Sequence, residues 1–163
     1  MTEITDTQTG MIYPTESKNA FSVEIHSEES FKSKILPHIE KYENTFFISI
    51  LDPNDETLYP PSEVYKTVKF YDVIDDVGNY NAISFEQAKE IKEFCFKNKG
   101  KKLIVHCGAG VSRSAAVAEW YFELLGGSYK QLTDRYKYIL PNPRVLSYLR
   151  MAEKENNLKI NFI

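Results

Sequence analysis

The sequence predicts an α/β fold, a single domain with a largely parallel central sheet flanked by helices. Segments rich in β-branched and aromatic residues alternate along the chain with segments whose apolar residues recur at helical spacing. Strands that alternate with helices are typical of parallel sheets, because each parallel crossover needs a long connection. The 163 residues, 42% of them hydrophobic, can bury one core, and no repeat or long linker divides them. We therefore expect one domain over residues 1–163.

Four segments have the composition of strands. They are residues 20–27, 45–51, 65–74 and 102–106. The first alternates apolar and polar residues, as a half-buried strand does, whereas the second is a run of β-branched and aromatic residues that suits a central strand. The polar, proline-rich stretch 52–63 is expected to be a loop.

Four segments are predicted to be helical. Residues 29–42 have apolar residues at helical spacing, with Pro37 expected to kink or shorten the helix. A second helix is expected to start at an N-cap, Ser84, and to stop near Gly100. A third starts near Ser114 and is rich in alanine, and a fourth lies within 141–155, with an Asn-Pro pair as its cap and first residue.

The charge and cysteine content restrict the possible partners and location. A net charge of −3 and a pI near 5.7 give no overall attraction to nucleic acid or anionic membranes, so we expect neither as a partner. Any anion must then be bound by a local site. With two cysteines, no signal-peptide pattern at the amino terminus and no apolar run of membrane-spanning length, the sequence predicts a reduced, cytoplasmic protein.

The stretch HCGAGVSRS, residues 106–114, predicts an anion-binding site. An apolar strand ends at Cys107, a loop of small residues follows, and a helix begins, which places the loop at the carboxyl edge of the sheet. In the loop, Gly108, Ala109 and Gly110 allow successive backbone N–H groups to point at one oxyanion. Arg113 adds a planar pair of donors that matches two phosphate oxygens.

Cys107 lies among these donors and is the candidate nucleophile. A helix N-terminus and a guanidinium group lower the pKa of a thiol, so the side chain is expected to be ionised near neutral pH. A phosphate bound in line with the sulfur would give a cysteinyl-phosphate that water then hydrolyses, with no metal and no cofactor. Ser114, or Ser112, could donate a hydrogen bond to the sulfur, and the leaving group needs a proton from a carboxylic acid on a nearby loop.

VHCGAGVSRS resembles the signature H-C-x5-R-[S/T] of the protein tyrosine phosphatase superfamily, in its compact dual-specificity-like branch. The resemblance covers roughly residues 45–150. It implies a dual-specificity-phosphatase-like fold, nucleophile Cys107, phosphate-clamping Arg113, a supporting hydroxyl at Ser114 and an upstream aspartic acid as general acid. It also implies that the loop backbone binds phosphate, through residues Gly108, Ala109, Gly110, Val111, Ser112, Arg113 and Ser114.

The departures from the family pattern bear on the substrate. The tyrosine-specific branch has a Trp-Pro-Asp loop, but Trp120, the single tryptophan, follows the signature and is expected in the core. Phosphoinositide-directed members tend to have lysines in the signature loop, where this chain has Ala109 and Val111. A phosphorylated protein is therefore the expected substrate, with phosphotyrosine and then phosphoserine or phosphothreonine as targets. A phosphoinositide or RNA 5′-phosphatase, or a weakly catalytic phosphate-binding module, are the alternatives.

The general acid has three candidates, all in FYDVIDDVG. Asp75 is favoured, because related compact phosphatases have their acid at a similar position before the next helix, and Asp72 and then Asp76 are the alternates. Asp72 can still belong to the strand, whereas Asp75 and Asp76 fall where the chain leaves the sheet. Gly78 gives that loop the freedom to close.

The remaining cysteine and histidine near the signature are expected to be structural. Cys95 lies between two phenylalanines on an amphipathic helix and is expected to pack in the core, with a disulfide to Cys107 as the lesser alternative. His106 is expected to form a hydrogen bond near the signature loop and so to influence that loop.

Overall fold

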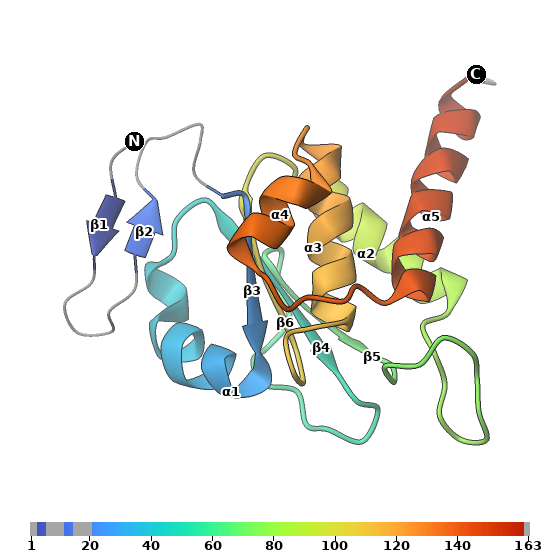
Figure 1. Ribbon diagram of the computed structural model, residues 1–163, viewed down its shortest axis with the longest axis horizontal. Coiled ribbons are helices and arrows are strands. Elements are labelled where there is room, and N and C mark those ends of the chain that lie inside the picture. Colours follow the sequence, from blue (N-terminus) through green and yellow to red (C-terminus); the bar gives the residue numbers. More distant parts are fainter. Residues whose placement is uncertain (1–2, 6–11, 15–20, 162–163) are drawn as a thin grey trace.

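A four-stranded, all-parallel sheet in the order β3-β6-β4-β5 forms the centre of the computed structural model (Figure 1). Its strands are β3 (Val23–Ser27), β4 (Thr45–Leu51), β5 (Tyr65–Lys69) and β6 (Lys102–Cys107). The structure describes residues 3–5, 12–14 and 21–161, with side chains from residue 21 to residue 155. A separate antiparallel pair is made by β1 (Glu3–Thr5) and β2 (Ile12–Pro14). The predicted α/β class with a parallel sheet is confirmed.

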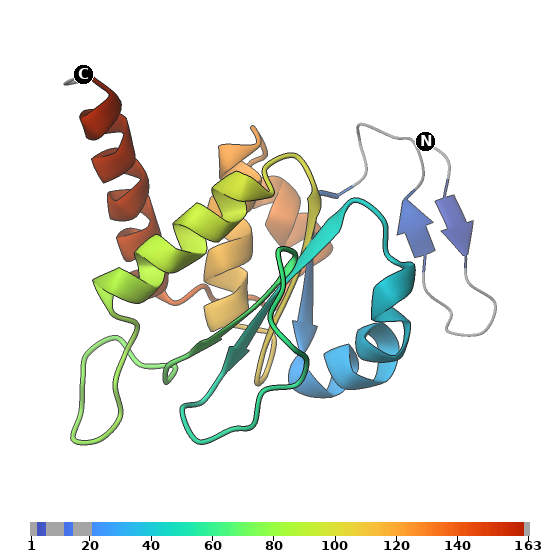
Figure 2. The same ribbon diagram turned by 180° about the vertical axis from the view of Figure 1, so that it is seen from behind.

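Helical segments cover both faces of the sheet, as the two opposite views show (Figures 1 and 2). One face carries α2 (Phe85–Lys97), α3 (Arg113–Leu124) and α5 (Pro143–Asn161), and α4 (Tyr129–Arg135) lies beside α3. The other face carries α1 (Glu28–Ser30), η1 (Phe31–Ile35) and η2 (Leu36–Lys41).

Strand β4 is central, and its sequence explains the two cores. All seven of its residues are buried, and alternate side chains point to opposite faces. Phe46 and Ile48 belong to the core shared with α2 and α3, whereas Phe47 belongs to the core under η1 and η2. A strand buried on both faces needs a continuous apolar run, and TFFISIL supplies one.

Strand β5 is shorter than the sequence predicted. The prediction of a strand over 65–74 is wrong beyond Lys69, although Phe70 N–H still donates to Leu51 C=O at 3.0 Å. Its partner β4 ends at Leu51, so residues after Phe70 have no strand residues on β4 with which to form sheet hydrogen bonds. The N–H of Tyr71 instead bonds to the C=O of Asn81, at 2.9 Å, which closes the loop of residues 71–82. Asp72 is therefore in this loop and not in the strand.

The first predicted helix is irregular, and one helix was not predicted. Residues 28–41 are helical, but as a succession of α, π and 3-10 turns, with Pro37 at the start of η2 and His38 outside helical geometry. Helix α4 was not predicted, although Ser128 and Gln131 form a capping box at its start.

The predicted helix ends elsewhere are confirmed. Ser84 caps α2, and that helix ends at Lys97, shortly before Gly100. The Oδ1 of Asn142 accepts from the N–H groups of Arg144 and Val145 and so caps α5. None of the described helices is long and apolar enough to cross a membrane.

Candidate active site

The loop of residues 108–112, here called the cradle loop, joins the end of β6 to the start of α3. It sits on the end of β3, which pairs with β6 in a register that puts Ser27 opposite Cys107. Gly108 C=O accepts from Glu28 N–H at 3.0 Å. Gly110 has φ +73°, and a Cβ there would lie 2.7 Å from the backbone nitrogen of Ser27. The glycine is thus required both by its conformation and by contact with β3.

Cys107 lies at the base of the cradle loop with 2% of its surface exposed. Burial by itself would raise the pKa of its thiol, but hydrogen bonds from Ser114, from the Ser114 and Gly110 N–H groups, and the charge of Arg113 together lower the pKa below its ordinary value. The Sγ of Cys107 and the Oγ of Ser114 are 3.1 Å apart. The structure thus brings the predicted nucleophile, serine and arginine together.

Arg113, the first residue of α3, is buried and is held at one end of its guanidinium group. Its Nη1 donates to Asp52 Oδ1 at 2.8 Å and to the C=O of Phe70 at 2.6 Å. The Nε has no hydrogen-bond partner among the described residues. Nη2 lies beside Gly108, at 3.4 Å from where a Cβ would be. One edge of the guanidinium is therefore anchored, whereas the buried Nε on the other edge has an unused donor.

Asp52, the anchor of Arg113, was not singled out from the sequence. It directly follows β4, and the carboxyl ends of parallel strands meet at one edge of the sheet, where sites form. This position at the carboxyl end of a strand was the one feature of the sequence that could have pointed to Asp52 as a site residue. Its side chain is 46% exposed, so the carboxylate keeps contact with water while it pairs with the buried guanidinium.

The loop of residues 71–82, here called the acid loop, is tied to the cradle loop through Asp72. Its Oδ1 accepts from Ser112 Oγ at 2.8 Å and from Asn142 Nδ2 at 2.9 Å. Ser112 is the N-cap residue of α3, yet its side chain makes no capping bond to that helix. The first N–H groups of α3 therefore remain for the site.

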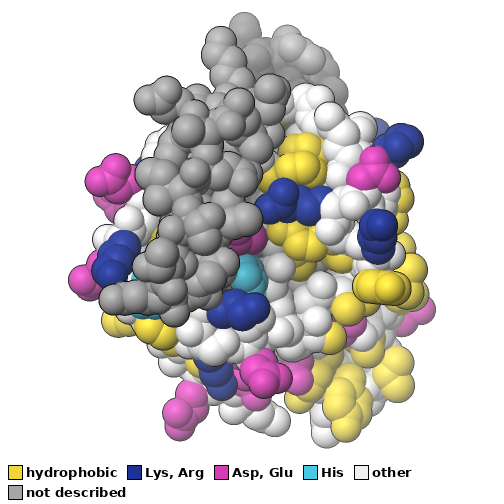
Figure 3. Space-filling model, turned by 60° about the vertical axis from the view of Figure 1, so that its left-hand side comes forward, with side chains coloured by type: hydrophobic (Ala, Val, Ile, Leu, Met, Phe, Trp, Pro, Cys, Tyr) yellow, Lys and Arg dark blue, Asp and Glu magenta, His cyan; other side chains and the backbone are white. Residues whose placement is uncertain are grey.

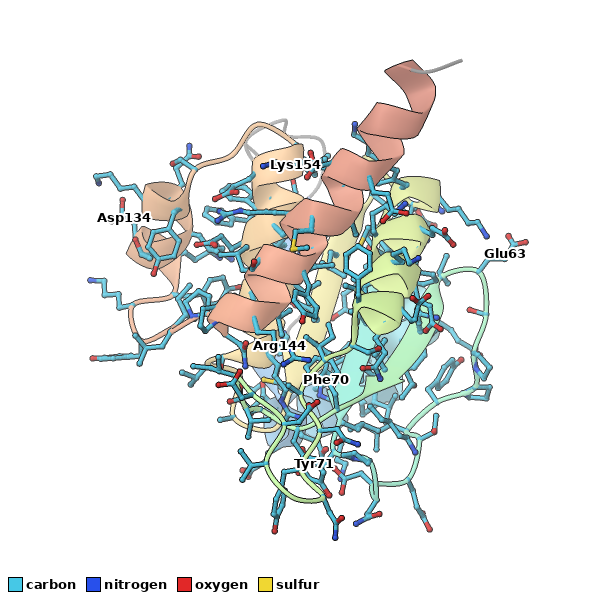
Figure 4. The ribbon with its side chains drawn as sticks, turned by 90° about the vertical axis from the view of Figure 1, so that its right-hand side faces the viewer. Glu63, Phe70, Tyr71, Asp134, Arg144 and Lys154 are labelled. Atoms are coloured by element: carbon cyan, nitrogen blue, oxygen red, sulfur yellow. The ribbon has the colours of Figure 1, made fainter. Side chains whose placement is uncertain are left out.

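The other two candidate acids lie farther along the acid loop. Asp75 is exposed and forms no hydrogen bond or ion pair with any described residue. Asp76 has a structural contact, since its Oδ1 accepts from Ala82 N–H at 2.9 Å. Arg144 fastens the same loop, since it donates to the C=O of Ile74 within the loop and to the C=O of Ile83 just after it, and it lies above Phe70 in Figure 4. Of the three candidates, Asp72, the alternate, is bonded to the cradle loop, and Asp75, the favoured one, is not.

His106 is buried beneath the cradle loop on the face that packs against η1. Its Nε2 and the Oγ of Ser49 are 2.5 Å apart, and its ring stacks on Phe31 with centroids 4.3 Å apart. Burial lowers the pKa of His106 to about 4, so the ring is neutral at physiological pH. These contacts agree with the structural role expected for it.

The second cysteine lies away from the nucleophile. Cys95 is in the last turns of α2, fully buried, and burial raises the pKa of its thiol. It interacts with Tyr121, whose hydroxyl bonds to the backbone of Gly100 and Lys101, before β6 begins. Cys107 is at the other end of β6, so the packing role fits and a disulfide between the two does not. Trp120, as expected, is in the core, 1% exposed.

In the described part of the chain, no group of three or more His, Cys, Asp or Glu side chains could hold a metal ion. The site combines an ionisable thiol with a guanidinium group and with N–H groups of the cradle loop and the start of α3, of which those of Gly110 and Ser114 donate to the Cys107 sulfur. The guanidinium and N–H groups are suited to a phosphate-sized dianion.

Comparison with known proteins identifies the fold. No protein-family model and no curated protein sequence matches the chain. Solved structures do match. The human tyrosine phosphatase-like serine/threonine/tyrosine-interacting protein is 24% identical, with a TM-score of 0.54, over 83% of this chain and 93% of that one. Human DUSP28 is 17% identical, with a TM-score of 0.56, over 86% and 96% of the two chains.

A third similar structure is PTPMT1 in complex with PI(5)P, which is 16% identical, with a TM-score of 0.53, over 85% of this chain and 94% of that one. Each similarity extends over most of both chains, so it concerns the whole arrangement of sheet and helices. At sequence identities of 16–24%, these similarities establish a common fold and nothing about function. This chain has the dual-specificity-like fold of the protein tyrosine phosphatase superfamily.

Proposed function

We propose that this protein is a cysteine-dependent protein phosphatase that hydrolyses phosphotyrosine and, more slowly, phosphoserine and phosphothreonine. The observation that carries the proposal is the surroundings of Cys107. Its pKa is lowered despite burial, and the guanidinium of Arg113, with its unused Nε donor, lies beside the same loop. A thiolate held under a set of anion donors is suited to attack a bound phosphate.

The first step transfers the phosphoryl group to the enzyme. The thiolate of Cys107 attacks phosphorus in line with the ester oxygen, a P–S bond forms, and the P–O bond to the leaving group breaks. The Nε/Nη2 edge of Arg113 and the N–H groups of the cradle loop bind the equatorial oxygens. Asp72 gives its proton to the leaving oxygen, a role supported by its place next to Ser112.

The second step returns the enzyme to its starting state. The carboxylate of Asp72 takes a proton from water, the water oxygen attacks phosphorus, and the P–S bond breaks to release phosphate. Ser114 supports this step because its hydroxyl, 3.1 Å from the sulfur, can donate to the thiolate as it leaves. The net reaction consumes one monoester and one water and gives one alcohol or phenol and one phosphate.

Turnover of p-nitrophenyl phosphate tests the proposal. The wild type is expected to hydrolyse it in the presence of a chelator. Cys107→Ser is expected to lose turnover but to keep phosphate affinity, because the donors are backbone groups and Arg113. Arg113→Lys is expected to be severely impaired, since a point charge cannot replace the planar fork. Full activity in Cys107→Ser would overturn the mechanism, and phosphate binding without wild-type turnover would make the protein a binding module.

A further inference from the structure

Exposed hydrophobic side chains are concentrated near the cradle loop. Among the described residues, seven large hydrophobic side chains are exposed, and five of them lie on two loops. The five, here called the apolar rim, are Ile74, Val77, Tyr80, Tyr138 and Leu140. The other two are Tyr129 and Met151. Single exposed apolar residues are ordinary, but a group of them beside a binding site indicates a contact surface.

Both loops of the apolar rim are bonded to the cradle loop. Leu140 N–H donates to Val111 C=O at 2.8 Å, which fixes the loop of residues 136–142 at one border. The acid loop is fixed at another border by the bond from Ser112 to Asp72. A ligand whose phosphate occupies the cradle loop would therefore have Leu140 and Ile74 nearest to the groups that flank its phosphate, with the rest of the apolar rim farther along the same two loops.

The backbone that carries the apolar rim is held in place. The C=O of Ile74 accepts from Arg144 Nη1 at 3.1 Å, and the ring of Tyr80 packs edge-on against that of Tyr71, with centroids 4.9 Å apart. Leu140 is 74% exposed and Tyr138 is 87% exposed. Exposed apolar side chains on a fixed backbone lose little entropy when a ligand covers them, which favours binding there.

The charges around the cradle loop indicate which ligand fits. Asp72 and Asp75 are exposed on the acid loop, whereas Asp76 lies 4.0 Å from Arg144 and Asp52 is paired with Arg113. Lys137 is exposed on the other loop of the apolar rim. The cradle loop contains no lysine. On the part of the surface that is visible beside the grey residues in Figure 3, Lys and Arg side chains are scattered among acidic and hydrophobic ones. Asp72 and Asp75, on either side of Ile74, disfavour acidic groups beside that part of the apolar rim.

We propose that the apolar rim binds residues that flank phosphotyrosine in a protein substrate, and that it selects apolar over acidic flanking residues. This inference rests on the proposed function, because the phosphate must first be bound by the cradle loop. The rim supplies the apolar contact, and the surrounding carboxylates disfavour the acidic alternative.

Binding to the Cys107→Ser protein tests this inference without requiring turnover. Two fluorescent phosphotyrosine peptides of equal length are compared, one with leucine and isoleucine beside the phosphotyrosine and one with glutamate at the same positions. We expect the apolar peptide to bind about tenfold more tightly. Ile74→Ser and Leu140→Ser, each added to Cys107→Ser, should remove most of that preference. Met151→Ser is the matched control, equally apolar and exposed but on α5, and should leave it unchanged.

The outcomes separate this inference from the proposed function. Equal affinity for the two peptides, or a preference that survives both rim substitutions, overturns the inference even if the wild type hydrolyses p-nitrophenyl phosphate. Tighter binding to vesicles of phosphatidylcholine and a phosphatidylinositol monophosphate than to either peptide also overturns it. A rim-dependent peptide preference supports it, even if wild-type turnover is absent and the phosphatase proposal fails.

Discussion

The carboxylate of Asp52 holds the guanidinium of Arg113 from the side opposite the cradle loop, with Oδ1 and Nη1 2.8 Å apart. The C=O of Phe70 shares the same Nη1. Because these two acceptors come from the ends of β4 and β5, the orientation of Arg113 depends on the sheet and not on the cradle loop alone.

Asp52→Ala is expected to reduce kcat/KM for p-nitrophenyl phosphate by about ten- to a hundredfold, because a guanidinium that loses one anchor is misplaced relative to the phosphate. Asp52→Asn, which keeps an oxygen acceptor, should recover part of the loss. Glu56→Ala is the control, an exposed carboxylate on the same loop. Phosphate affinity, measured by calorimetry, should fall along with activity in Asp52→Ala. Behaviour identical to that of Glu56→Ala would contradict a positioning role for Asp52.

Asp72→Asn and Asp75→Asn form a matched pair on the acid loop. Asp72→Asn should slow hydrolysis of aryl phosphates with poor leaving groups far more than that of p-nitrophenyl phosphate, and should remove the alkaline fall in rate. Asp75→Asn should do neither, since Asp75 is exposed and forms no hydrogen bond or ion pair with any described residue. Rates across a series of substituted phenyl phosphates distinguish the two. If only Asp75→Asn has these effects, the general acid is Asp75, as the sequence favoured.

Ser114→Ala is expected to raise the pKa of the Cys107 thiol. Burial raises that pKa already, and the Ser114 hydroxyl is the largest of the contributions that lower it. The measurement is the pH dependence of alkylation by iodoacetamide, which should shift toward higher pH in the variant. Cys95→Ser is the control and should leave the profile unchanged, because Cys95 is buried and its own pKa is raised. An unshifted profile in Ser114→Ala would show that the hydroxyl does not stabilise the thiolate.

Gly110→Ala should destabilise the fold more than Gly100→Ala. Both glycines have positive φ, so both substitutions incur the left-handed cost of about 1–2 kcal/mol. A Cβ on Gly110 would also meet the backbone of His26 and Ser27, whereas one on Gly100 would meet nothing within 4 Å. Thermal unfolding monitored by circular dichroism gives the comparison. If Tm decreases equally in Gly110→Ala and Gly100→Ala, the cradle loop can move away from β3 without loss of stability.

Protonation of His106 is expected to destabilise the protein in mild acid. Its pKa is about 4 in the folded protein and 6.5 ordinarily, so the unfolded chain binds the extra proton between those values and stability falls as pH decreases from 6.5 to 4. The full effect is on the order of 3 kcal/mol. Urea unfolding of wild type and His106→Gln over this range measures it.

The comparison with His106→Gln is needed because Glu119 acts in the opposite direction. Burial raises the pKa of Glu119, so its contribution decreases stability as pH rises above 4.5. That contribution is common to both proteins and cancels in the difference. If wild type and His106→Gln lose stability in parallel, His106 is not the titrating group.

The parts that could be predicted from sequence are those that short-range patterns determine. Strand β4 and the caps Ser84 and Asn142 lie where composition and capping chemistry placed them, because these features involve neighbouring residues. The end of β5 could not be predicted in this way. It depends on where its partner strand stops, and FYDV is apolar enough to read as a strand in isolation.

In the site too, contacts between residues close in sequence could be predicted, and contacts between distant residues could not. The cluster of Cys107, Ser114 and Arg113 follows from one contiguous segment, so its spacing predicted the grouping. The contacts of Asp52 and Asp72 join residues far apart in the sequence, so the ranking of Asp75 before Asp72 and Asp76 had to rely on family resemblance and on the expected end of the strand. Asn142 was recognised as a helix cap, but its second bond, to Asp72, depends on the tertiary fold.

The close contact between Gly110 and the end of β3 has a consequence for how the protein reaches its native state. Strand β3 is early in the chain, whereas its partner β6 follows β4, β5 and α2, so this pairing has a large sequence separation and is slow to form. Because Gly110 fits against the backbone of His26 and Ser27, we expect the cradle loop to reach its final position only after β3 has paired with β6. The site is thus completed by a contact between distant parts of the sequence, although its chemical groups come from one short segment.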